Sequence, residues 1–133
     1  MTLRVSTYDP KIDAICFDTG EPHDETDEID YCSGHILDYD SATYRPTSFE
    51  LVLCAKGYLR LSPEQGYDAD TDILTFGKGL ARSEFMVANG DLMAHWGYEL
   101  PEDDPEPEPE FYTLVAVQLR NASRHLAAVI AAL

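Results

Sequence analysis

Positively charged side chains are scarce in this sequence of 133 residues, which has 9 Lys and Arg against 25 Asp and Glu. The formal net charge is −16 at pH 7, and the sequence pI is about 4.3. A surface with that charge repels nucleic acids and anionic membranes and attracts basic partners. Direct nucleic-acid binding is therefore not expected, because it needs a cationic footprint.

Long hydrophobic runs are also missing. No stretch reaches the roughly 18 apolar residues of a transmembrane helix, and no apolar run typical of a signal peptide follows Arg4. Cys16, Cys32 and Cys54 are an odd number without the spacing of a disulfide framework, which suits a reducing compartment. These absences predict a cytoplasmic protein with no membrane partner, and the length predicts a single domain over residues 1–133.

Carboxylates are abundant, and two stretches concentrate them. The segment 99–110 holds seven acids and four prolines but no base. Alternating Pro-Glu favours polyproline II, so this segment would be either an interdomain spacer or a stiff anionic strip for a basic partner. The second stretch, residues 18–30, is predicted as an acidic loop or short helix. It lies in a region from Ile12 to Tyr44 that holds ten acids and no Lys or Arg.

The apolar pattern predicts an α+β fold around a small antiparallel sheet. Strands are predicted at Leu3–Tyr8, Lys11–Phe17 and His35–Tyr39. A central hairpin is predicted over about 49–62, because two apolar-rich runs flank Gly57, which can take a positive φ. A helical region is predicted over about 80–98, with a helix that stops at Asn89-Gly90 and a second short helix.

The last segment fits two structures. Seven apolar residues repeat at alternating spacings of three and four, which predicts one long C-terminal helix with a heptad seam. The seam would pack on the protein's own sheet or join two copies into a homodimer. Its residues are Tyr112, Val115, Leu119, Ala122, Leu126, Val129 and Leu133, of which Tyr112, Val115, Leu119, Leu126 and Val129 would form the dimer contact. The alternative is a strand over 111–120, followed by a short helix capped by Asn121.

Motifs for metal binding and catalysis are incomplete. Asp68-Ala-Asp-Thr-Asp72 begins like a calcium loop, but Ile73 and Gly79 stand where glycine and a bidentate Glu are needed. Cys32 and His35 have a spacing that zinc tolerates, without a second pair of the usual kind. No signature links a Cys or Ser nucleophile to a histidine. We predict no cofactor and no enzyme activity, with a small metal-binding enzyme using Cys32 and His35 as an alternative.

Three short motifs are shared with one known family. Tyr31-Cys-Ser-Gly34, Leu61-Ser-Pro-Glu64 and Ala81-Arg-Ser-Glu84 resemble segments of small plasmid antirestriction proteins of the ArdB/KlcA kind. The resemblance covers about residues 30–98 and implies interference with host restriction enzymes. The Pro-Glu segment and the heptad pattern depart from that family.

The segregated acids predict an inhibitor of phage or plasmid origin that binds the basic nucleic-acid-binding surface of a host-defence nuclease or effector complex. Its carboxylates would stand in for phosphates, as in an anti-CRISPR or antirestriction DNA mimic. The predicted partner-binding residues are Asp24, Glu25, Asp27, Glu28, Asp30, Asp103, Asp104, Glu106, Glu108, Glu110, Tyr31 and Tyr98. One alternative is an immunity protein that neutralises a basic toxin. Another is that the acids only keep the protein in solution.

Overall fold

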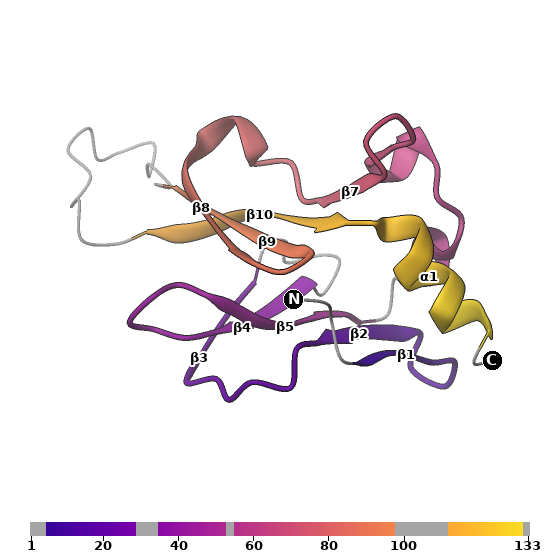
Figure 1. The fold of residues 1–133 in the computed structure, drawn as a ribbon, viewed down its shortest axis with the longest axis horizontal. Coiled ribbons are helices and arrows are strands. Elements are labelled where there is room, and N and C mark those ends of the chain that lie inside the picture. The colour runs from indigo at the N-terminus through magenta and orange to yellow at the C-terminus, as the bar shows by residue number, and fades with distance from the viewer. Residues whose placement is uncertain (1–4, 29–34, 53–54, 98–111, 132–133) are drawn as a thin grey trace.

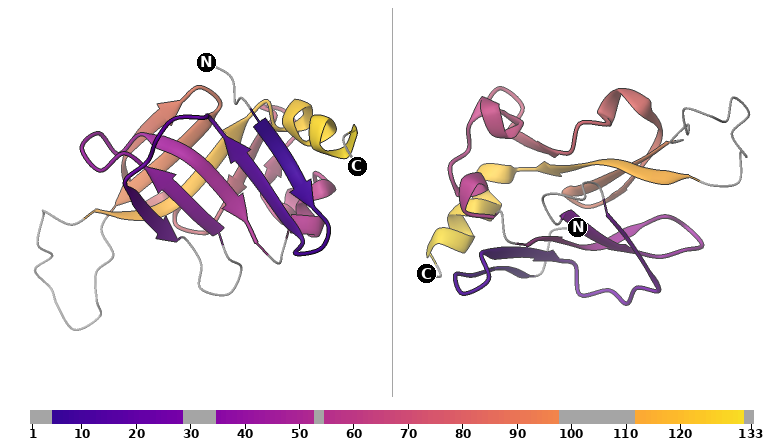
Figure 2. Two further views of the ribbon diagram at one scale, coloured as in Figure 1. Left: turned by 90° about the horizontal axis from the view of Figure 1, so that it is seen from below. Right: turned by 180° about the vertical axis from the view of Figure 1, so that it is seen from behind.

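Two five-stranded antiparallel sheets face each other across one core, as the computed structural model of residues 5–28, 35–52, 55–97 and 112–131 shows (Figures 1 and 2). The first sheet has the order β1 (Val5–Asp9), β2 (Ala14–Asp18), β5 (Pro46–Leu51), β4 (His35–Tyr39) and β3 (Glu25–Glu28). The second has the order β6 (Tyr67–Asp68), β7 (Ile73–Phe76), β10 (Thr113–Arg120), β9 (Leu92–Gly97) and β8 (Ser83–Asn89).

Short helices complete the fold. The chain crosses from the first sheet to the second through the 3₁₀ helices η1 (Ala55–Leu59) and η2 (Pro63–Gln65), and η3 (Leu80–Arg82) precedes β8. The helix α1 (Ala122–Ala131) follows β10 and lies at one end of the two layers, against β1 (Figure 2). None of the described helices is long and apolar enough to cross a membrane.

The core lies between the sheets because the strands alternate buried apolar residues with outward-facing ones. In β2, Ile15 and Phe17 are fully buried while their neighbours are only partly covered, and Leu37 repeats the pattern in β4. In β5, Phe49 and Leu51 are fully buried and Glu50 between them is partly covered. The second sheet contributes a matching inner face of Leu74, Phe76, Ala94, Trp96, Val117 and Leu119. Three of the predicted strands are confirmed as β1, β2 and β4.

The predicted α+β layout with a helical region and a central hairpin is wrong, because the described fold is mostly β. Residues 83–97 form the hairpin β8–β9, and Asn89-Gly90 turns it with Gly90 at φ 62°. Alternation explains the result, since Phe85 and Val87 pack against the core while Glu84 and Met86 are exposed. The hairpin over 49–62 is also absent. β5 ends at Leu51 and pairs with β2 and β4 instead.

The single long C-terminal helix is likewise wrong, and the alternative of a strand followed by a short helix is correct. β10 is the central strand of its sheet and also contacts η3, and its residues Leu114–Val117 are all buried, so its apolar run is nearly continuous. Asn121, whose backbone φ is 53°, separates β10 from α1. Val115, Leu119, Leu126 and Val129 are buried within this chain, so they form no exposed seam for a homodimer.

Two aspartates from turns of the second sheet hold the start of α1. Asp72 accepts hydrogen bonds from the backbone N–H of Ser123 at 3.0 Å, from its hydroxyl at 2.7 Å and from the Tyr67 hydroxyl at 2.7 Å. The bonds from Tyr67 and Ser123 lower the pKa of Asp72. These contacts satisfy the backbone N–H of Ser123 in the first helical turn, which would otherwise be unpaired. Asp72 thus acts as an N-cap although it is distant in sequence.

Asp91 binds the next turn of the same helix. Its carboxylate lies 2.8 Å from His125 Nε2, 3.1 Å from the Arg124 guanidinium and 3.0 Å from the Asn121 side-chain nitrogen. Burial raises the pKa of Asp91, but the hydrogen bonds from His125 and Asn121 and the nearby positive charges outweigh it, so the net shift is downward. The helix is thus fixed to the second sheet while its apolar side faces the core.

Candidate functional site

The strands of the first sheet carry a strong excess of acids. Seven carboxylates and no Lys or Arg occur in those strands, whereas the strands of the second sheet hold two carboxylates and one arginine. The seven are Asp9, Asp18, Glu25, Asp27, Glu28, Asp38 and Glu50, and the second sheet has Asp68, Glu84 and Arg120. The charge of the strands is therefore distributed unequally between the two sheets.

Three of these acids gather on the outer face of the first sheet. Asp18 and Asp38 flank Ser48 on neighbouring strands, and Glu50 follows Ser48 by two residues. Their buried neighbours in each strand point inward, so these carboxylates point outward. Diagonal neighbours in an antiparallel sheet lie roughly 7–8 Å apart, so Glu50 stands at about that distance from both aspartates. We call Asp18, Asp38 and Glu50 the acidic face.

The acidic face is held in place by hydrogen bonds across the sheet. Asp38 accepts one from the Thr26 hydroxyl at 2.8 Å and another from the Ser48 hydroxyl at 2.8 Å. His23 Nε2 lies 3.8 Å from the same carboxylate. Asp18 accepts a hydrogen bond from the backbone N–H of Gly20 at 2.7 Å. Asp18 and Asp38 are therefore oriented by hydrogen bonds within the fold before any partner arrives.

The thiol of Cys16 lies close to the negative charges of the acidic face, which affect its pKa. It pairs with Glu50 in the sheet and is only partly covered. Burial, followed by the negative charges of Glu50 and Asp18, raises the pKa of the Cys16 thiol to about 12. The thiol therefore stays protonated at neutral pH and is a weak nucleophile.

Of the predicted partner-binding acids of residues 24–28, the structure describes the side chains of Asp24, Glu25 and Asp27, and their surroundings differ. Asp24 is bound to Ser41 by two hydrogen bonds of 2.7 Å, and bonds to the hydroxyl and the backbone N–H lower its pKa. Residues 25–28 form the edge strand β3 rather than a loop or helix. Glu25 is exposed, but Asp27 accepts a hydrogen bond from the backbone N–H of Leu114 at 3.3 Å and faces the second sheet. Glu28 belongs to the same strand.

The remaining predicted contacts lie outside the described residues. They are Asp30, Tyr31, Tyr98, Asp103, Asp104, Glu106, Glu108 and Glu110. The residues that flank the Pro-Glu segment are informative, because Gly97 and Thr113 are paired in neighbouring strands β9 and β10. The segment thus connects two strands of one sheet and does not link two domains.

Sequence reasoning missed the acidic face itself. Asp18, Asp38 and Glu50 each follow a buried apolar residue, Phe17, Leu37 or Phe49, which is the alternation of a half-buried strand. That signal was available in the sequence. The antiparallel pairing that brings the three together was not, because it joins residues of β2 and β5 that lie 30 to 36 positions apart in the chain.

Comparisons with protein-family models, with curated proteins and with solved structures found no match for this chain.

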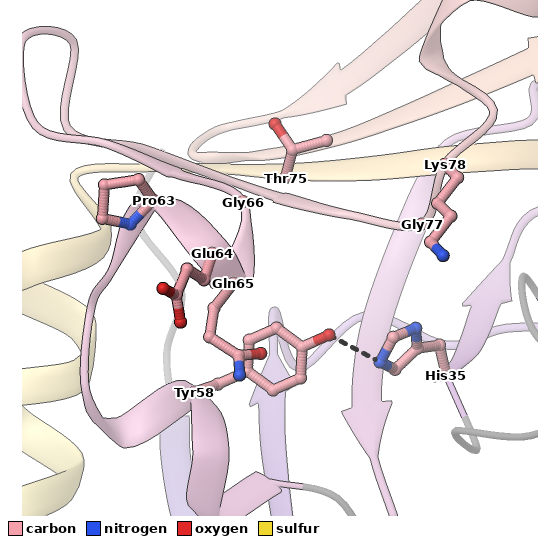
Figure 3. A pocket seen from close by; sticks show the side chains of 9 residues that line it. All are labelled: His35, Tyr58, Pro63, Glu64, Gln65, Gly66, Thr75, Gly77 and Lys78. Carbon is pink, nitrogen blue, oxygen red and sulfur yellow. Dashed lines mark hydrogen bonds between the residues drawn. The ribbon is translucent and has the colours of Figure 1, made fainter.

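A pocket of about 350 Å³ lies where the chain crosses between the sheets (Figure 3). Its lining includes His35 from β4, Tyr58 from η1, Glu64 and Gln65 from η2, and Thr75 and Lys78 from the second sheet and the loop that follows β7. The Tyr58 hydroxyl lies 3.3 Å from His35 Nε2. Such a volume is at the lower end of the range for small-molecule sites.

A chain of polar side chains crosses the outer face of the second sheet. His95 Nε2 lies 2.7 Å from the Gln118 amide oxygen, and His95 Nδ1 lies 3.0 Å from the Ser83 hydroxyl. Because the amide oxygen accepts only, His95 Nε2 carries a proton and donates it to Gln118. The Ser83 hydroxyl, which lies 3.0 Å from His95 Nδ1, is also 3.3 Å from the carbonyl oxygen of Phe85. Gln118 also donates to Thr75 at 3.0 Å, so the chain joins all four long strands of this sheet. Sequence reasoning did not link Ser83 with His95.

The predicted metal alternatives gain no support from the described residues. None of their His, Cys, Asp and Glu side chains form a group of three that could hold a metal ion. His35 is only 2% exposed and packs against Phe49 and Tyr58, while Cys32 lies outside the described residues. Asp68 and Asp72 instead serve the turn and α1, since Asp68 accepts a hydrogen bond from the backbone N–H of Asp70.

Proposed function

We propose that this protein is an acidic inhibitor that occupies the basic nucleic-acid-binding surface of a host-defence nuclease or effector complex, of the antirestriction or anti-CRISPR type. The observation that carries the proposal is the segregation of charge between the sheets. Seven carboxylates without a single Lys or Arg occupy the strands of one layer, and three of them form the acidic face.

The geometry suits such a surface for a physical reason. A groove that binds nucleic acid presents Lys and Arg side chains to a regular series of phosphates. Carboxylates fixed about 7–8 Å apart on a sheet offer a comparable series without the entropy cost of ordering a flexible chain. The net charge of −16 speeds the approach to a basic surface. We assign the Pro-Glu segment, with Asp103, Asp104, Glu106, Glu108 and Glu110, as a second anionic contact on the basis of its sequence, because residues 99–110 hold seven acids and no base.

The test is competition with DNA at defined targets. A type I restriction enzyme, a DNA-cleaving CRISPR effector complex and a basic nuclease toxin are each bound to a fluorescent duplex, and its displacement is followed by anisotropy. We expect displacement from one of the three, with an inhibition constant that weakens steeply as salt rises from about 50 to 200 mM. The toxin would identify an immunity protein. Displacement from none of them would contradict the proposal.

Matched variants locate the contact. Asp18→Asn with Glu50→Gln removes two of the three charges of the acidic face, and Asp68→Asn with Glu84→Gln removes the same charge from the strands of the second sheet. We expect the first pair to weaken inhibition about tenfold or more and to flatten its salt dependence, while the control pair changes it little. Equal losses in both pairs would mean that only net charge matters. Neutralising residues 103–110 with Asn and Gln tests the second contact in the same assay.

A further inference from the structure

The pocket between the sheets carries opposite charges on its two sides. Figure 3 shows Glu64 and Gln65 on one side and Lys78 with His35 on the other, with the ring of Tyr58 between them. Among the described residues, neither Glu64 nor Lys78 takes part in an ion pair. Two charged groups of opposite sign therefore line one pocket without neutralising each other.

We propose that this pocket binds a small zwitterion of the α-amino-acid class, with the ligand carboxylate at Lys78 and the ligand ammonium at Glu64. The proposal is separate from the inhibitor function, because the pocket shares no residue with the acidic face. A ligand with both charges satisfies both side chains at once. Glu64 and Lys78 are both exposed, so a ligand with one charge leaves the other side chain in water and gains only one of the two charge-assisted contacts.

The overall charge of the protein also favours a neutral ligand. A simple anion would meet the field of a protein with net charge −16, and a simple cation would meet Lys78 inside the pocket. A zwitterion has no net charge, so the local arrangement of Glu64 and Lys78 decides its orientation. The volume of about 350 Å³ admits a molecule of amino-acid size.

The aromatic wall of the pocket indicates the kind of ligand side chain. Tyr58 lies edge-on to His35, with ring centroids 5.7 Å apart, and packs on Phe76 at 5.2 Å. His35 in turn contacts Phe49 and Phe76. A ring held on several sides is preorganised, so it binds a flat or apolar group at little cost in conformational entropy. We therefore expect amino acids with apolar or aromatic side chains to bind best.

The experiment uses the full chain and a panel of L-amino acids at millimolar concentration. Thermal unfolding detects binding, since a ligand that binds only the folded state raises the melting temperature as its concentration rises. Calorimetry then gives the dissociation constant of the best ligand. We expect its analogues without the amino group or without the carboxyl group to bind about ten- to a hundredfold more weakly.

Variants on both sides complete the test. Lys78→Met and Glu64→Gln should each weaken binding by a similar factor, whereas Lys11→Met and Glu84→Gln, which lie outside the pocket, should leave it unchanged. Melting temperatures without ligand show that each variant folds. Three results would overturn the proposal: no amino acid binds, the singly charged analogues bind as well as the zwitterion, or the pocket variants bind like their controls.

Discussion

The contact between Asp91 and α1 gives the sharpest test of how this fold is held together. Asp91→Asn keeps the shape of the side chain but removes its charge and one of its two acceptor oxygens. The wild-type carboxylate is 13% exposed, and its partner His125 is 7% exposed, so neither group is replaced easily by water. In the variant, one amide oxygen must accept the hydrogen bonds that two carboxylate oxygens accept in the wild type.

The size of the effect follows from the partners. A hydrogen bond to a charged group is worth about 1.5–3 kcal/mol when it is buried, and an exposed ion pair about 0–1 kcal/mol. Arg124 is 62% exposed, so its contribution is small, and the amide retains part of the His125 bond. We expect the free energy of unfolding to fall by about 1–2 kcal/mol. Unfolding entropy of about 2.1 cal/mol/K per residue then predicts a melting temperature lower by about 4–7 °C.

The dependence on pH has a definite sign. The pKa of Asp91 is lowered by folding, so its contribution is present above the pKa of the unfolded chain, near 3.9, and is lost as pH falls through the folded value. Urea unfolding of wild type and variant should therefore differ at pH 7, and the difference should shrink as pH falls below about 3.9. Asp70→Asn, at an exposed position in the same sheet, is the control and should leave stability unchanged. A variant as stable as wild type at pH 7, or a difference that grows at low pH, would refute the reasoning.

Three further predictions concern other parts of the fold. Gly97→Ala should unfold the protein or lower its stability by more than about 3 kcal/mol by circular dichroism, because a Cβ there would overlap the backbone carbonyl oxygen of Arg82; a folded variant of normal stability would contradict the packing. The Cys16 peptide should resist iodoacetamide at pH 8 in the native protein and react in urea, as mass spectrometry would detect, since its pKa is about 12; rapid native alkylation would count against the acidic environment. Replacing residues 99–110 with a short glycine-rich turn should leave the melting temperature nearly unchanged, because Gly97 and Thr113 already pair; a large loss of stability would show that the segment is part of the fold.

The sequence predicted strands where alternation was clear and failed where two periodicities overlapped. β1, β2 and β4 follow from short alternating runs. In β10 and α1, however, buried positions on a central strand continue into buried positions on a helix, and together they imitate a heptad repeat. Spacing alone cannot separate the two, since the break at Asn121 is a single residue with positive φ. The β8–β9 hairpin shows the opposite error, in which Asn89-Gly90 was interpreted as a helix stop although it is also a typical hairpin turn.

The candidate site was predictable in charge but not in geometry. The ten acids between Ile12 and Tyr44 are plain in the sequence, and they include Asp18 and Asp38 of the acidic face. Which of those acids share a face depends on strand pairing. Asp27 accepts a hydrogen bond from Leu114 of the second sheet, whereas Asp38 accepts one from Ser48 of its own sheet. The pocket depended on contacts between residues 35, 58, 64 and 78, which only the tertiary fold brings together.

The order of the strands along the chain has a consequence for how the molecule could be divided. Every strand of the first sheet lies within residues 5–51, and every strand of the second lies within residues 67–120. Each sheet can complete its own backbone pairing from one continuous fragment, yet each would then expose a row of apolar side chains that only the other fragment covers. A chain cut after residue 53 should therefore give two pieces that are unstructured or aggregate separately and fold on mixing. Such a pair would form a split reporter whose reassembly is driven by the apolar interior.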